Sequence, residues 1–215
     1  MRAVAYFLAG SGGLTLLLAL SRGLAGRRRA ALGHALLGAL LIAGAALLWP
    51  VAANLGTYQA LRPGAAVAQV SCERTGSRSH RLTLTRLPSG HMQVFEVTGD
   101  EWRMDTRTLA WRGLAVELGL EPVFRLDRLS TRYLSTAGAG DAAPSSYRLS
   151  DEVGEDIWAQ ARTGSRWSHY AVAEHAYGPW SPLAQRARYE LWFDATGLHV
   201  RPVNEAATDA LQPRP

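Results

Sequence analysis

Two apolar runs at the start of the chain, residues 3–20 and 30–53, constrain its fold more than any other feature. The first run contains no acidic, basic or histidine side chain, and the second contains only His34. A helix needs about 20 apolar residues to cross the roughly 30 Å hydrocarbon core of a bilayer, so each run is long enough to span one. The sequence therefore predicts a two-helix transmembrane hairpin over residues 1–53, with the lipid bilayer as its first partner.

The loop between the two runs, residues 21–29, sets the expected orientation. It carries Arg22, Arg27, Arg28 and Arg29, whereas the first charge beyond the second run is Arg62. Short loops rich in arginine stay in the cytoplasm, so the N-terminus and everything after residue 53 should lie outside. This predicts a two-pass protein of the bacterial inner membrane with a periplasmic C-terminal domain. The alternative is that residues 1–20 are a cleaved signal peptide, which would leave one span and a cytoplasmic domain.

Small residues recur at every fourth position in both runs. Such stripes let helix backbones approach closely in lipid, so we expect them to pack within the hairpin or to dock a partner helix or a second copy of the chain. His34 lies about one turn into the second run, where it either reaches the headgroups or takes part in a proton relay. Pro50 is expected to end the second helix. The expected packing residues are Ala5, Ala9, Gly13, Ala31, Ala35, Ala39 and Ala43.

The charge balance of the chain argues against a nucleic-acid partner. The net charge is +5 and the sequence pI is about 9.9, yet all 18 acidic residues follow residue 53, and five of the 23 basic residues precede it. The region after residue 53 is therefore neutral overall, and the excess positive charge belongs to the hairpin. A phosphate-binding surface would instead concentrate basic residues on the folded domain.

After residue 53 the apolar period changes to two, which is typical of half-buried strands. The pattern predicts an α+β fold: the transmembrane hairpin, a tether over 54–66, a mostly antiparallel β-sheet domain over 67–204 with one or two short helices covering a face, and a flexible tail over 205–215. Short helices are expected within 111–120 and from Ser150 onward, and 164–186 should be irregular. The expected strands are 67–73, 81–87, 92–98, 101–108, 123–133, 147–149, 187–193 and 198–203.

No pattern of residues predicts catalysis, a metal or a cofactor. The sequence lacks HExxH, Walker and G-x-S-x-G motifs, and the glycines of residues 10–13 lie inside an apolar run rather than between a strand and a helix. One cysteine, Cys72, cannot form an intramolecular disulfide, so it is either buried or bridges to another chain. His169, Glu174 and His175 match no common metal site, and they would form a hydrolase site only if a cleft gathered them.

Aromatic residues gather between residues 167 and 180, where no apolar period is visible. Tyrosine and tryptophan in loops suit contact with a partner or a ligand. The expected partner surface consists of Trp167, Tyr170, Tyr177 and Trp180.

Six stretches of the chain carry a resemblance to known proteins: residues 94–105, 111–113, 118–122, 125–130, 156–158 and 201–204. They resemble a family of small bacterial inner-membrane proteins that carry the label multidrug transporter or cation/multidrug efflux pump. The resemblance covers roughly residues 50–205 together with the two-helix start, and it implies no catalytic residue. A solute pump needs a pathway lined by several helices, so the role that the resemblance implies for two spans is that of an accessory subunit.

The sequence thus favours a membrane-anchored periplasmic binding or scaffold protein that contacts another envelope protein and is not an enzyme. Two alternatives remain: an accessory subunit of a multidrug or cation transport system, and a periplasmic hydrolase.

Overall fold

The computed structural model describes residues 2–135, 143–151, 153–194 and 196–212. Two compact units divide the chain: Met1–Gln59 with Glu152–Trp167, and Ala60–Asp151 with Ser168–Pro215. The expected domain of residues 67–204 is therefore interrupted, because the segment around residues 152–167 belongs with the hairpin. The two-residue strand β1 (Gln59–Ala60) lies at the boundary between the units.

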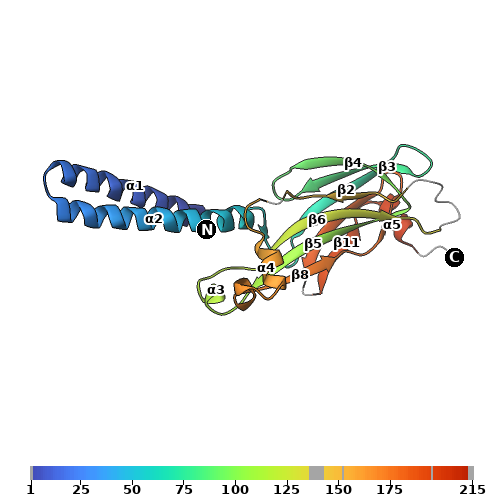
Figure 1. Ribbon diagram of the computed structural model, residues 1–215. Helices are drawn as coiled ribbons and strands as arrows, with labels where there is room; N and C mark the ends of the chain where they lie inside the picture. Colours follow the sequence, from blue (N-terminus) through green and yellow to red (C-terminus); the bar gives the residue numbers. More distant parts are fainter. Residues whose placement is uncertain (1, 136–142, 152, 195, 213–215) are drawn as a thin grey trace. The chain divides into compact units, whose positions relative to one another are not determined.

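Two long helices, α1 (Arg2–Leu24) and α2 (Arg28–Leu55), form most of the first unit (Figure 1). Both are long and apolar enough to cross a membrane. They extend beyond the predicted spans into the 21–29 loop, because arginine is a good helix former and helical hydrogen bonding continues where the apolar run stops. The connection shrinks to residues 25–27, with Gly26 at a φ of +76°. Pro50 lies inside α2 and does not end it, as spanning helices tolerate.

The two helices approach each other closely at Gly12 and Gly38. A Cβ atom on Gly12 would lie 2.7 Å from Ile42 Cγ1, and one on Gly38 would lie 2.8 Å from the Leu16 side chain. Any larger residue at either position would push the helix backbones apart. In lipid, where helices associate mainly through packing, such a close approach would stabilise the hairpin.

The contact face of the hairpin differs from the expected four-residue stripe. A helix has 3.6 residues per turn, so a strict four-residue step drifts by about 40° each time and leaves the interface. A seven-residue step stays on one face. The buried small residues follow that spacing: Ala5, Gly12, Ala19, Gly38 and Ala45. Of the expected residues, Ala5 is buried, Gly13, Ala31 and Ala35 are half-buried, and Ala9, Ala39 and Ala43 are exposed.

A later segment of the chain binds the end of α2. The Asn54 amide donates to the Val153 carbonyl at 3.1 Å, and the Glu155 backbone N–H donates to the Pro50 carbonyl at 3.4 Å. Gly154 fits there because a Cβ would lie 2.2 Å from that carbonyl oxygen. The segment continues into α4 (Ile157–Arg162). The Asp156 carboxylate caps α4 by accepting from the Ala159 N–H at 3.1 Å, so the helix begins later than the expected Ser150.

Two antiparallel sheets form the second unit (Figure 1). The first sheet has the order β11 (Gly197–Pro202), β10 (Arg188–Asp194), β2 (Ala66–Arg74), β3 (Ser79–Arg86) and β4 (Met92–Thr98). The second sheet contains β6 (Val123–Arg132), β5 (Glu101–Trp111) and β8 (Ala171–Tyr177) in that order, with β7 (Ser146–Arg148) on β6 and β9 (Ser181–Pro182) on β5.

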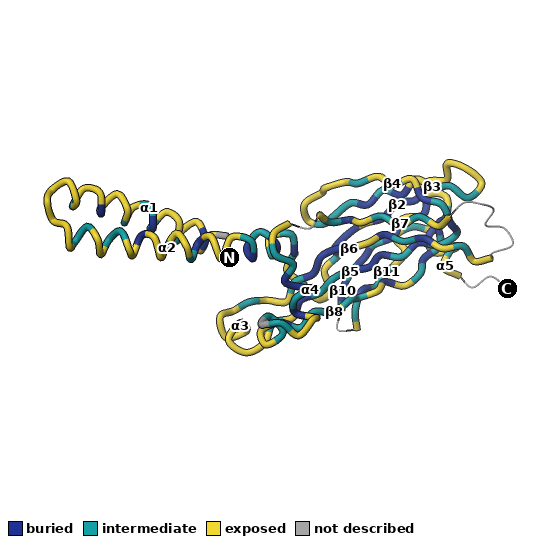
Figure 2. The backbone as a smooth tube through the Cα atoms, in the orientation of Figure 1, coloured by how far each residue is buried: buried dark blue, intermediate teal, exposed yellow. Residues whose placement is uncertain are grey.

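The two sheets share one hydrophobic core, which makes the second unit a β-sandwich. Leu82 and Leu84 of the first sheet lie in the same buried cluster as Met104 of the second. Two aromatic pairs join the sheets: Trp102 with Tyr189, and Phe124 with Phe193, at ring-centroid distances of 5.6 and 5.0 Å. Figure 2 shows the buried backbone concentrated along the facing strands. The mixed α+β class with antiparallel sheet is confirmed. The expectation that short helices cover one face of the sheet is wrong, because the two sheets cover each other.

Three local expectations are corrected. Strand β8 and the short 3-10 helix η2 (Arg166–His169) occupy part of the region expected to be irregular. The expected flexible tail contains α5 (Glu205–Leu211), whose Ala207 is fully buried in the core, whereas 213–215 lie outside the described residues. Strand β5 continues to Trp111, so the helix expected at 111–120 is reduced to α3 (Leu114–Glu117). In each case, contacts with distant segments decide the outcome.

Candidate partner-binding surface

Acidic and basic residues alternate along the outer face of β5. Trp102 and Met104 point into the core, so Glu101, Arg103 and Asp105 point outward. The Arg103 Nε lies 2.8 Å from Asp105 Oδ1, forming an ion pair along the strand. Glu101 pairs in register with Arg132 of β6, and its Oε2 lies 2.6 Å from the Arg132 Nε.

Trp180 joins these two ion pairs. The guanidinium carbons of Arg103 and Arg132 lie 4.6 and 4.5 Å from the centroid of its indole ring. Arg103 also lies 5.0 Å from the centroid of the Tyr177 ring. We call this group the arginine–aromatic ladder; its members are Glu101, Arg103, Asp105, Arg132, Tyr177 and Trp180.

A glycine places Trp180 over β5. After β8 ends at Tyr177, the Gly178 N–H donates to the Met104 carbonyl at 2.9 Å. A Cβ atom at position 178 would lie 2.9 Å from that same oxygen, too close for any other residue. The chain therefore lies flat against β5 at this point before it enters β9. Trp180 lies in the segment that connects β8 to β9.

Within the ladder, the Asp105 side chain is buried and the Tyr177 side chain is exposed. Asp105 is buried, and burial raises the pKa of its carboxyl, an effect that the neighbouring Arg103 guanidinium opposes. Tyr177 remains 58% exposed. Each cation–π contact at such a site is worth about 0.5–1 kcal/mol. The ladder is therefore a pre-ordered set of arginine and aromatic side chains on the outer face of the second sheet.

The structure brings together only part of the expected partner surface. Tyr177 and Trp180 meet through Arg103, but Tyr170 precedes the opposite end of β8. At about 3.3 Å per residue, β8 separates Tyr170 from Tyr177 by roughly 20 Å. Trp167 ends the other unit and is half-buried.

Sequence reasoning missed the two arginines of the ladder. The outward alternation of Glu101, Arg103 and Asp105 around the buried Trp102 was visible in the sequence. It could have placed the charges on the outer face of β5, but not the aromatic rings beside them.

The structure does not gather His169, Glu174 and His175 around one cleft. Glu174 and His175 are neighbours on β8, so their side chains lie on opposite faces of the strand, and His169 lies in η2 before the strand begins. Among the described residues, no group of three or more histidine, cysteine, aspartate or glutamate side chains could hold a metal ion.

A second cluster on the β10–β11 turn resembles a catalytic triad only in composition. Thr196 Oγ1 and Asp194 Oδ1 lie 2.7 and 2.9 Å from the same His199 nitrogen, Nε2. In a triad the nucleophile and the carboxylate use different ring nitrogens. Because Thr196 Oγ1 also donates to the Asp194 carboxylate, this arrangement stabilises the turn and provides no general base.

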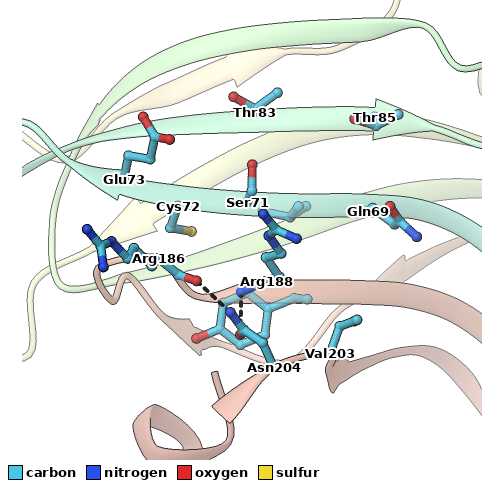
Figure 3. Close-up of a pocket in the computed structure, with 12 residues that line it drawn as sticks. Gln69, Ser71, Cys72, Glu73, Thr83, Thr85, Arg186, Arg188, Val203 and Asn204 are labelled. Atoms are coloured by element: carbon cyan, nitrogen blue, oxygen red, sulfur yellow. Dashed lines mark hydrogen bonds between the residues drawn. The ribbon is translucent and has the colours of Figure 1, made fainter. Parts of the chain in front are cut away.

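The outer face of the first sheet bears a polar pocket of about 760 Å³ (Figure 3). Ser71 and Thr83 point out from the sheet, whereas Cys72 points to the other side. The Cys72 thiol is fully buried, and burial raises its pKa to about 12, so it is not a nucleophile at neutral pH. The pocket offers hydrogen bonds to solvent or a ligand through hydroxyl, amide and arginine groups.

Comparison with protein-family models, with curated proteins and with solved structures returned no match for this chain.

Proposed function

We propose that this protein is a membrane-anchored binding or scaffold protein whose β-sandwich contacts another envelope protein through the arginine–aromatic ladder. The observation that carries this proposal is the placement of Trp180 against two guanidinium groups, each held by its own carboxylate. This arrangement suits binding because the ion pairs hold both arginine side chains in one orientation before a partner binds.

Two physical arguments support a protein partner. Residues that dominate protein interfaces are enriched in tryptophan, tyrosine and arginine, and these three types make up the core of the ladder. Side chains already held in one conformation also lose less entropy on association, so each contact contributes more to affinity. Tyr177, at the exposed edge, offers an apolar ring and a hydroxyl to the partner.

The anchor is the two-helix hairpin, and its proposed orientation follows from the arginines of residues 22–29. With this connection in the cytoplasm, the N-terminus and the β-sandwich face the periplasm of the bacterial inner membrane. A reporter enzyme that is active only in the periplasm, fused after Pro215, should give signal, and one that is active only in the cytoplasm should not. The reverse result would remove both the compartment and the proposed class of partner.

Site-specific photo-crosslinking tests the partner surface directly. A photoreactive amino acid at position 177 of the full chain should form a discrete crosslink to an envelope protein in intact cells. The matched control is position 170, also tyrosine and 46% exposed, which should give no such product. Trp180→Ala should abolish the crosslink from position 177.

Two results would contradict the proposal. Equal crosslinking from positions 177 and 170 would show that the ladder is not the contact. A monomer that yields no crosslink and co-purifies with nothing in mild detergent would show that there is no stable partner.

A further inference from the structure

A second pocket, of about 520 Å³, opens at one end of the β-sandwich, between the two sheets. Its walls come from the ends of β2 and β3, the turn between β4 and β5, the segment after β9 and the last turn of α5. The volume lies in the range of small-molecule sites.

A buried histidine with no hydrogen-bond partner lines this pocket. His80 follows the inward alternation of β3 and is only 3% exposed. Among the described residues, neither ring nitrogen has a hydrogen-bond partner. Leaving buried polar atoms unsatisfied costs free energy, and a molecule bound in the pocket would remove that cost.

An unpaired positive charge lies beside His80. Arg74 of β2 is the register partner of His80 across the β2–β3 ladder, so both side chains lie on the same face, about 5 Å apart at their Cβ atoms. The Arg74 guanidinium has no carboxylate partner among the described residues. The Arg74 backbone N–H donates to the Gln185 side-chain oxygen, which fixes this wall of the pocket.

The same pocket is lined by a negative charge, Asp100, whose carboxylate is only partly hydrogen-bonded. One oxygen of the Asp100 carboxylate accepts from the Leu134 N–H at 3.0 Å, and the other has no partner in the described part of the chain. Both charges reach the imidazole: burial lowers the pKa of His80, Arg74 lowers it further, and Asp100 raises it. The pocket is thus lined by a cation and an anion that are not paired with each other, together with an imidazole that can donate and accept a hydrogen bond.

We propose that this pocket binds a small zwitterion of the free α-amino acid type, with its carboxylate on Arg74, its ammonium on Asp100 and a hydrogen bond to His80. Charge-assisted hydrogen bonds at both ends give the specificity, since a ligand with one charge would leave the other protein charge unmatched. This inference does not depend on the proposed partner surface, although Trp180 and Glu101 form part of the pocket wall.

Isothermal titration calorimetry of the full chain in detergent, preceded by a thermal-shift screen of the twenty common amino acids, tests the proposal. At least one amino acid should bind at low millimolar concentration or below. Arg74→Gln and Asp100→Asn should each weaken it by at least about tenfold, the effect of losing one charge-assisted hydrogen bond. Arg81→Gln, which removes an exposed ion pair between Arg81 of β3 and Glu96 of β4, should leave binding unchanged.

Modified ligands separate the two ends of the site and do not depend on the variants folding. The N-acetyl derivative of the best ligand should bind at least about tenfold more weakly, and its residual binding should not change with Asp100→Asn. The carboxamide derivative should weaken similarly and be insensitive to Arg74→Gln. If no amino acid binds, or if both derivatives bind as tightly as the parent compound, the proposal is wrong.

Discussion

Replacing Asn204 should destabilise the β-sandwich far more than its position near the end of the chain suggests. Its side-chain oxygen accepts from the Ala207 N–H at 3.2 Å, which caps α5, and from the Arg188 N–H at 3.0 Å. Its side-chain nitrogen donates to the Arg186 carbonyl at 2.7 Å. One side chain therefore joins the start of β10, the turn before it and the last helix, as the dashed bonds in Figure 3 show in part.

The magnitude follows from these three bonds. A typical intramolecular hydrogen bond contributes about 1 kcal/mol net, and loss of an asparagine N-cap alone costs about 1 kcal/mol. Because Asn204 is half-buried, water replaces part of what Asn204→Ala removes, and we expect a loss of about 2–3 kcal/mol in the free energy of unfolding. Asn204→Asp keeps both acceptor bonds and loses only the donor to Arg186, so it should cost about 1 kcal/mol.

Urea unfolding of the full chain in detergent, followed by tryptophan fluorescence, measures the difference. With a slope of about 2 kcal/mol per molar urea, Asn204→Ala should lower the midpoint by about 1 M and Asn204→Asp by about half as much. Asp209→Ala, on the exposed side of the same helix, should change the free energy of unfolding by less than about 0.5 kcal/mol. If Asn204→Ala behaves like this control, the three bonds contribute nothing and the reasoning fails.

Three further outcomes are expected. Cys72 should stay unlabelled by a maleimide at pH 8 until urea unfolds the protein, because the thiol is buried and its raised pKa of about 12 keeps it protonated; rapid labelling of the native chain would contradict this. Gly38→Leu should lower the midpoint of thermal helix unfolding measured by circular dichroism. Gly33→Leu should not, because a Cβ at position 33 meets nothing within 4 Å. Equal decreases of the midpoint in both variants would refute the close approach of the helices. Because the pKa of His80 is lowered in the folded protein, the unfolded chain takes up the proton first on acidification. The stability of the wild type should therefore fall as the pH drops below about 6.5, and His80→Gln should reduce this pH dependence. The same pH profile of stability in both proteins would contradict this prediction.

The sequence alone was enough for features that depend on neighbouring residues. The length of the apolar runs predicts two helices that can span a membrane, and the alternation in 81–87 predicts β3 almost to its ends. The turn residues around Gly99 and Gly197 mark the β4–β5 and β10–β11 turns. These signals are local because they reflect the period of one helix or one strand.

Only the tertiary structure decided how distant segments combine. Strand β8 shows little alternation in sequence and forms because β5 pairs with it, and α5 forms where Ala207 can enter the core. The segment around 152–167 joins the hairpin through hydrogen bonds to Pro50 and Asn54, a contact that no local pattern indicates.

The candidate sites show the same division. Composition predicted that Tyr177 and Trp180 matter for binding, but Arg103 and Arg132 reach Trp180 only because β5, β6 and the segment after β8 lie side by side. His80 and Arg74 became part of a pocket through strand register. Local sequence determines which way each side chain points along its own strand, whereas the neighbours of that side chain depend on strand pairing and on the burial of apolar surface across the whole chain.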